Sequence, residues 1–125
     1  MKNIITVIII FTVLIGGCFF SAAYLSKTRH ELERDLSAIQ KLIDDDYKAA
    51  GHYLVSLENT LDKNKTQLAV FINHNLIENM ELSLKFIKEF YLSGDRARLR
   101  EHLHEMKFYV SQISDEHALN FENLL

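Results

Sequence analysis

The stretch IITVIIIFTVLIGGCFFSAAYL, Ile4 to Leu25, decides the fold, because it runs for 22 residues without a charge. At a rise of 1.5 Å per residue, a helix of this length is roughly 33 Å long and matches a hydrocarbon core of about 30 Å. It is longer than the hydrophobic region of a signal peptide, which has about 7–15 residues. The sequence therefore predicts a transmembrane helix at 4–25, a membrane anchor at 1–25 and one helical domain at 26–125.

Charge and composition limit what the rest of the chain can be. The formal net charge is -3, and every charged residue except Lys2 follows the apolar stretch. A mildly acidic domain without a basic cluster argues against binding nucleic acid or anionic lipid through a polybasic segment. Proline is absent and glycine occurs four times, so turns are few and long helices are favoured. We expect an all-α protein.

The single cysteine leaves one alternative for the anchor open. Cys18 cannot form a disulfide framework or a cysteine-based metal site by itself. The segment Ile15-Gly16-Gly17-Cys18 resembles the lipobox of bacterial lipoproteins, which would imply cleavage before Cys18 and a lipid on its sulfur. A lipoprotein usually continues into a polar tether, whereas Phe19 to Leu25 are uncharged and mostly apolar. This favours an uncleaved anchor.

An amphipathic stripe follows the apolar stretch. Apolar or small residues recur at steps of three and four, which is helical periodicity: Leu32, Leu36, Ile39, Ile43, Tyr47, Ala50, Leu54, Leu57, Leu61, Leu68, Phe71 and Ile72. The simplest interpretation is one helix that leaves the membrane and continues to about Ile72. Its stripe needs a covering partner, either from the same chain or from a second copy or helical partner protein. We expect a homodimer that packs through Leu32, Leu36, Ile39, Ile43, Leu54, Leu57 and Leu61.

Two shorter helices are predicted beyond this stripe. Asn73-His74-Asn75 marks a break, because asparagine suits both helix ends and caps. In Ser93-Gly94-Asp95, Gly94 fits the left-handed position after a helix and Asp95 fits the cap of the next one. The last helix is expected to fade near Ser114-Asp115. Gly51 predicts a close contact between helices. The predicted core consists of Leu36, Ile39, Ile43, Leu54, Leu57, Leu61, Phe71, Met80, Leu84, Ile87, Leu99, Leu103, Met106 and Val110.

The sequence shows no catalytic or metal-binding pattern. Six histidines are present, but His102 and His104 are two residues apart and so lie on different helix faces. No HExxH motif, nucleophile elbow or glycine-rich phosphate loop occurs. His30-Glu31-Leu32 matches only three residues of the phosphoacceptor motif of histidine kinases. We therefore expect no enzyme activity, no cofactor and no metal.

The segment YLSGD, Tyr91 to Asp95, is followed by RARLREHLHEM, Arg96 to Met106, with a GD-x-x-x-L element formed by Gly94, Asp95 and Leu99. Together with the preceding membrane helix, this order resembles the opening of Cache-type extracytoplasmic sensor domains of bacterial chemoreceptors, sensor kinases and diguanylate cyclases. The tail HALNFENLL, 117–125, suits either a short helix or the lead-in to a strand. The resemblance implies a sensor module and a strand near Phe121 to Leu125. The sheet, the ligand pocket and the output domain of that family have no counterpart here, so the resemblance implies a truncated form and transfers no ligand-binding residues.

Two functions from different classes remain open. The first is a membrane-anchored helical sensor or signal-transduction module, and the second is a coiled-coil structural or accessory subunit of a cell-envelope complex.

The sequence contains two opposed signals for the side of the membrane on which the helical domain lies. Lys27, Arg29 and Arg34 outnumber Lys2 and favour a cytoplasmic domain by the positive-inside rule. The short Met-Lys-Asn lead is the usual start of a bacterial signal anchor with an exported remainder, so we expect a single-pass inner-membrane protein whose C-terminal part is periplasmic.

Overall fold

The chain folds into helices almost throughout. A computed structural model describes the backbone of residues 2–124 and the side chains of residues 2–113. It contains four helices, α1 (Lys2–Asp45), α2 (Tyr47–Phe71), α3 (His74–Ser93) and α4 (Arg96–Leu124). Between residues 2 and 124 the backbone forms no strand. The predicted all-α fold is confirmed.

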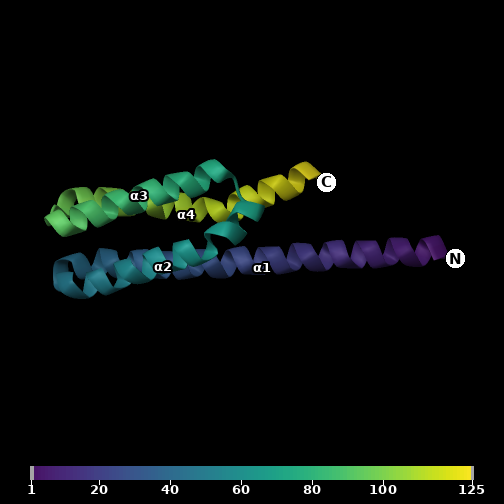
Figure 1. The fold of residues 1–125 in the computed structure, drawn as a ribbon, viewed down its shortest axis with the longest axis horizontal. Helices are drawn as coiled ribbons and strands as arrows, with labels where there is room; N and C mark the ends of the chain where they lie inside the picture. The colour runs from purple at the N-terminus through teal and green to yellow at the C-terminus, as the bar shows by residue number, and fades with distance from the viewer. Residues whose placement is uncertain (1, 125) are drawn as a thin grey trace.

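The helices form two antiparallel hairpins that pack into one bundle (Figure 1). α2 folds back along α1, and α4 folds back along α3. The two hairpins meet where α1 packs against α4 and α2 packs against α3. This is the up-down-up-down arrangement of a four-helix bundle, built here from a single chain. The N-terminal part of α1 extends beyond the bundle.

The predicted single helix to Ile72 is wrong, because the chain turns at Asp46. This residue has φ -151° and ψ 88°, and its carboxylate accepts a hydrogen bond from the Ala49 backbone N–H at 3.2 Å. Three successive aspartates, Asp44 to Asp46, put negative charge at the C-terminus of α1, where the helix dipole disfavours it. Asp46 is a favourable cap at the N-terminus of α2, so the same residue ends one helix and begins the next.

The other two turns lie where the sequence predicted them. Asn73 caps α3 and accepts a hydrogen bond from the Asn75 backbone N–H at 2.8 Å. Gly94 ends α3 in the left-handed conformation with φ 76°, which glycine adopts without the steric cost of a Cβ atom. Asp95 then accepts from the Arg98 backbone N–H at 3.2 Å and so caps α4.

The C-terminal predictions are wrong for the described residues. α4 does not fade near Ser114-Asp115 and continues to Leu124. The strand expected at Phe121 to Leu125 is helical through Leu124, and Leu125 lies outside the described residues. α4 is therefore a single helix from Arg96 to Leu124.

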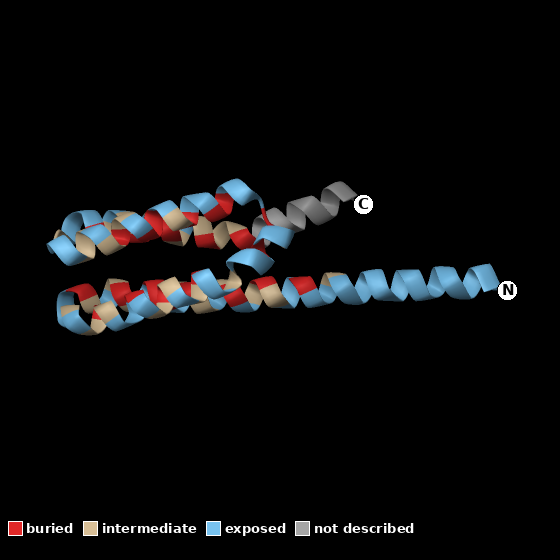
Figure 2. Cartoon of the chain, viewed as in Figure 1, coloured by how far each residue is buried: buried red, intermediate tan, exposed pale blue. Residues whose placement is uncertain are grey.

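α1 has two parts, an exposed N-terminal segment and a C-terminal part that packs into the bundle core (Figure 2). Of the fourteen predicted core residues, all are buried except Phe71, which is partly buried. The first buried residue of α1 is Ser21, so bundle packing begins inside the predicted span, four residues before its end at Leu25. From Ile4 to Phe20 the large apolar side chains are more than half exposed. α1 is long and apolar enough to cross a membrane.

Candidate functional site

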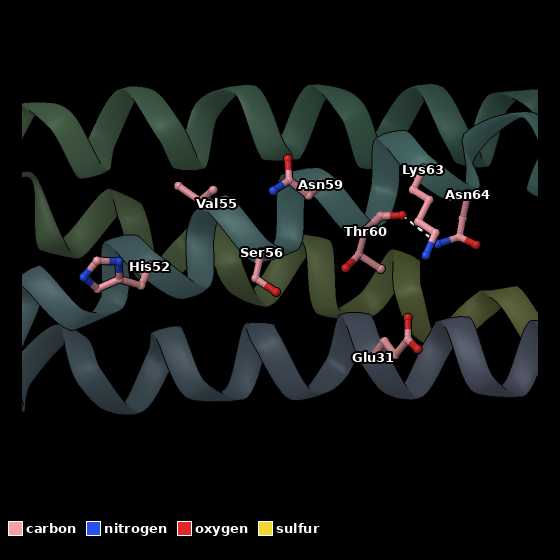
Figure 3. A pocket seen from close by; sticks show the side chains of 8 residues that line it. All are labelled: Glu31, His52, Val55, Ser56, Asn59, Thr60, Lys63 and Asn64. Atoms are coloured by element: carbon pink, nitrogen blue, oxygen red, sulfur yellow. Dashed lines mark hydrogen bonds between the residues drawn. The ribbon is translucent and has the colours of Figure 1, made fainter.

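A polar groove lies between α1 and α2 (Figure 3). It has a volume of about 380 Å³ and is open to solvent along one side. α1 contributes one residue to its lining, and α2 contributes the others at helical spacing along one face: Glu31, His52, Val55, Ser56, Asn59, Thr60, Lys63 and Asn64. Small hydroxyl and amide side chains at these positions keep the groove open, since larger apolar residues would close it.

One lining residue, Ser56, is bonded to a buried carboxylate. Asp35 of α1 is 1% exposed, and one of its oxygens accepts a hydrogen bond from the Ser56 hydroxyl at 2.9 Å. The Arg34 guanidinium lies 3.9 Å from the other oxygen, but its side chain is 72% exposed. Ser56 therefore joins the groove surface directly to a polar group inside the bundle core.

A tyrosine of α1 bonds to the lining residue Asn64. The Tyr24 hydroxyl donates to the Asn64 side-chain oxygen at 2.6 Å. The Asn64 amide in turn donates to the Thr60 backbone oxygen at 2.8 Å. This chain of hydrogen bonds fixes the position of α2 against α1 at the point where α1 leaves the bundle.

The far end of the bundle is held by two tyrosines that bond to each other's backbone. Tyr47 and Tyr91 stack with ring centroids 4.7 Å apart. The Tyr47 hydroxyl donates to the Tyr91 carbonyl at 2.5 Å, and the Tyr91 hydroxyl donates to the Tyr47 carbonyl at 3.0 Å. Burial raises the pKa of Tyr47, and Tyr91 beside it adds to this, while the Arg96 guanidinium over the ring opposes it. Gly51 makes the contact possible, because an added Cβ would overlap Tyr91 Oη.

The groove has the chemistry of a binding site and lacks the order of a catalytic triad. Its rim carries both signs of charge, with Glu31 on α1 and Lys63 on α2, and its amides offer donors and acceptors. In a serine triad the imidazole stands between hydroxyl and carboxylate. Here the Asp35 carboxylate accepts directly from Ser56. The arrangement suits a polar ligand or a polar helix face.

Comparison with known families assigns the bundle to a recognised domain. Residues 19–124 match the model of a family described as a domain of unknown function, DUF4363. The chain belongs to the DUF4363 family. The match begins just before Ser21, so the DUF4363 domain coincides with the packed bundle. No curated protein and no solved structure matches the chain. None of these findings bears on the resemblance to Cache-type sensor domains.

The residues predicted as a dimer stripe are the internal core of the DUF4363 bundle. Each is at most 6% exposed within the single chain: Leu32, Leu36, Ile39, Ile43, Leu54, Leu57 and Leu61. The helices of the same chain cover these side chains, and the predicted dimer stays a prediction. A dimer through this stripe would require the bundle to open. Gly94 and Asp95 form a turn, as predicted, at the end of the bundle away from the exposed part of α1.

Two histidines of α4 contact side chains of neighbouring helices. His102 stacks on Phe86 and Phe90, with ring centroids 4.9 and 5.3 Å away. His104 lies 3.4 Å from the Gln40 side chain on α1. Among the residues with described side chains, no three His, Cys, Asp or Glu residues are grouped so that they could hold a metal ion.

Sequence reasoning missed Asp35 and Ser56. One signal for Asp35 was available, because it lies three residues after Leu32 and four before Ile39, at the spacing of the buried stripe. An acidic residue at core spacing is rarely fully buried unless it is paired. Ser56 carries no comparable signal, since a serine on a helix surface is common. Only the packing of α2 on α1 reveals the pair.

Proposed function

We propose that this chain is a membrane-anchored helical sensor module that binds a small polar ligand at the α1–α2 groove and passes the event to the membrane through α1. The supporting observation is that α1 is one unbroken helix from Lys2 to Asp45. Glu31, which lines the groove, and Asp35, which bonds to the lining residue Ser56, belong to the same helix as the apolar segment. The module acts by packing and is not an enzyme.

A helix that continues from a membrane into a bundle is a suitable transmitter. The backbone hydrogen bonds of an α-helix make it stiff, so a shift of α1 against α2 moves its membrane part as well. A ligand can bias such a shift only if it binds one packing arrangement more tightly than the other. The groove meets this condition in principle, because its two walls are different helices.

We place the bundle on the outer side of the inner membrane, as a single-pass anchor with an exported domain. Lys27, Arg29 and Arg34 oppose this orientation by the positive-inside rule, so it needs a direct test. The test is thiol labelling of Lys65→Cys in intact cells, in a Cys18→Ala background. A membrane-impermeant maleimide labels the exported protein, whereas protection until the cells are lysed would place the bundle in the cytoplasm.

Transmission can be tested without knowing the ligand, by using Zn²⁺ as a substitute. Asn59→His and Lys63→His place two imidazoles four residues apart on α2, in the groove that Glu31 lines from α1. Zn²⁺ held by these three residues would tie α2 to α1. The reporter is Phe11→Trp in the apolar segment, read by brominated-lipid quenching of the full chain in vesicles.

The sensor proposal predicts that Zn²⁺ raises the melting temperature and changes the quenching of the tryptophan at position 11. The matched control is the variant with Asn59→His alone, in which neither should change. If Zn²⁺ raises the melting temperature and the quenching stays constant, the groove does not communicate with the membrane segment. The sensor proposal would then be rejected.

The second candidate is an accessory subunit of an envelope complex, and an exposed apolar residue on α2 favours it. Val55 is 57% exposed and lies among the polar side chains that line the groove. This surface suits a helix of a partner protein or of a second copy. Photo-crosslinking from position 55 in cells distinguishes the two candidates, because a subunit gives one discrete adduct and a small-molecule sensor gives none.

A further inference from the structure

The turn between α2 and α3 lies beside the apolar part of α1 (Figure 1). Tyr24 and Phe71 have ring centroids 6.1 Å apart, so the end of α2 reaches the membrane-facing part of α1. Ser21 and Leu25 are 5% and 1% exposed, although both belong to the stretch predicted to span the membrane. Ile72, the residue that ends α2, is 5% exposed. The bundle therefore overlaps the last turns of the apolar stretch.

This overlap leaves no free length between bundle and bilayer. The exposed part of the apolar stretch, Ile4 to Phe20, has about 17 residues and measures roughly 25 Å as a helix. The hydrocarbon core of a bilayer is about 30 Å thick. A helix turn cannot enter that core with its backbone exposed to lipid, because its unpaired N–H and C=O groups need polar partners. This favours a position of the α2–α3 turn near the lipid headgroups, although α4 continues past the turn in the same direction.

The sequence of this corner fits that position. The segment TQLAVFINHNLI, Thr66 to Ile77, contains no Asp, Glu, Lys or Arg. Val70 is 75% exposed, although it is apolar. His74 and Asn75 are exposed at the start of α3, where His74 Nε2 lies 3.0 Å from the Glu78 carboxylate and Asn75 can bond to headgroups. An uncharged segment with an outward apolar side chain and polar neighbours is suited to the interfacial region of a bilayer.

We propose that the corner Thr66 to Ile77 docks on the surface of the bilayer that α1 spans, with the Val70 side chain inserted below the headgroups. The proposal rests on the proposed membrane anchoring of α1. Two attachments, one through α1 and one through the corner, hold the bundle at a fixed tilt. They also hold α2 and α3 at the membrane surface, so that α1 can move relative to helices whose position is fixed.

Depth-dependent fluorescence quenching tests this inference, and the chain contains no tryptophan that would interfere. Three full-length variants carry one tryptophan each: Phe11→Trp in the membrane segment, Val70→Trp in the corner, and Val55→Trp on the exposed face of α2. Each is reconstituted into phosphatidylcholine vesicles with bromine at a shallow or a deep position of the acyl chains. A fourth variant, Ala69→Trp, serves as a second corner reporter if Val70→Trp loses its helical circular dichroism.

The inference predicts several-fold stronger quenching of the corner tryptophan than of the one at position 55, with shallow bromines more effective than deep ones. Deep bromines should quench the tryptophan at position 11 best. If that tryptophan is quenched and neither corner reporter is quenched above the position 55 control, the docking inference is overturned while membrane anchoring stands. If the tryptophan at position 11 is not quenched, the membrane anchor itself fails.

Discussion

Gly51 of α2 faces the Tyr91 side chain of α3, and replacing it with alanine sets two opposed effects against each other. Alanine in a helix interior is favoured over glycine by about 1 kcal/mol. Against this, the new Cβ would overlap Tyr91 Oη and lie 3.0 Å from Cζ, so the ring must move. Gly51→Ala should therefore lower the stability of the bundle, contrary to its effect on helix propensity alone.

The size of the change in unfolding free energy follows from the contacts that the displaced Tyr91 ring would lose. Moving it weakens the stack on Tyr47, worth about 0.5–1.5 kcal/mol. It also breaks the hydrogen bond to the Tyr47 carbonyl, worth about 0.5–1.5 kcal/mol. After the gain in propensity, the free energy of unfolding should fall by up to about 2 kcal/mol. In a Tyr91→Leu background the overlapping atoms are gone, and Gly51→Ala should instead stabilise by about 1 kcal/mol.

The assay is thermal unfolding of the full chain in detergent micelles, followed by far-ultraviolet circular dichroism. A change of 1 kcal/mol moves the melting temperature of a domain of this size by about 4–8 °C. The four proteins of the cycle are the natural chain, Gly51→Ala, Tyr91→Leu and the double variant. If Gly51→Ala raises the melting temperature equally in both backgrounds, the close contact between α2 and α3 does not exist in solution.

Four further substitutions test other parts of the account. Leu57→Asp places a charge at a fully buried position, so the monomeric protein should lose its cooperative thermal unfolding transition. If the variant still unfolds cooperatively and only dimerises more weakly in analytical ultracentrifugation, the stripe is not internal to one chain. Asp46→Ala removes the cap of α2 and should lower the free energy of unfolding in urea by about 1 kcal/mol, whereas no change would count against the turn. Gly94→Ala should cost about 1 kcal/mol in the same titration because of the positive φ, with Gly94→Asn costing less. Because burial raises the pKa of Tyr47, its contribution is complete below about pH 10 and is lost as the pH rises further, so Tyr47→Phe should flatten the alkaline fall in melting temperature.

Two of the three turns could be predicted because their residues have conformational requirements of their own. Gly94 is suited to a left-handed backbone, and Asn73 and Asp95 are suited to capping. Asp46 was missed for a geometric reason. The turn there takes only one non-helical residue, so the stripe continues from Ile43 to Tyr47 without a change of phase. Periodicity alone cannot distinguish such a hairpin from a straight helix.

The face of each helix that is buried could be predicted, but not the partner that buries it. Apolar stripe residues such as Leu36 and Leu57 must pack against another helix. The sequence pattern is equally compatible with a helix of a second copy and with a second helix of the same chain. The groove was also beyond prediction. Asn59 and Thr60 belong to no motif, and the bond between Ser56 and Asp35 joins residues that only the antiparallel turn brings together.

The central claim is that one chain closes its own four-helix bundle by turning at Asp46. The most direct test is a distance between spin labels at Lys27→Cys and Lys65→Cys, both exposed, in a Cys18→Ala background reconstituted into vesicles. A single straight helix would separate these positions by about 57 Å, whereas neighbouring helices in a bundle have axes about 8–10 Å apart. The account predicts a label-to-label distance below about 30 Å that is unchanged by dilution with unlabelled protein. A distance near 57 Å, or a short distance that disappears on dilution, would contradict it.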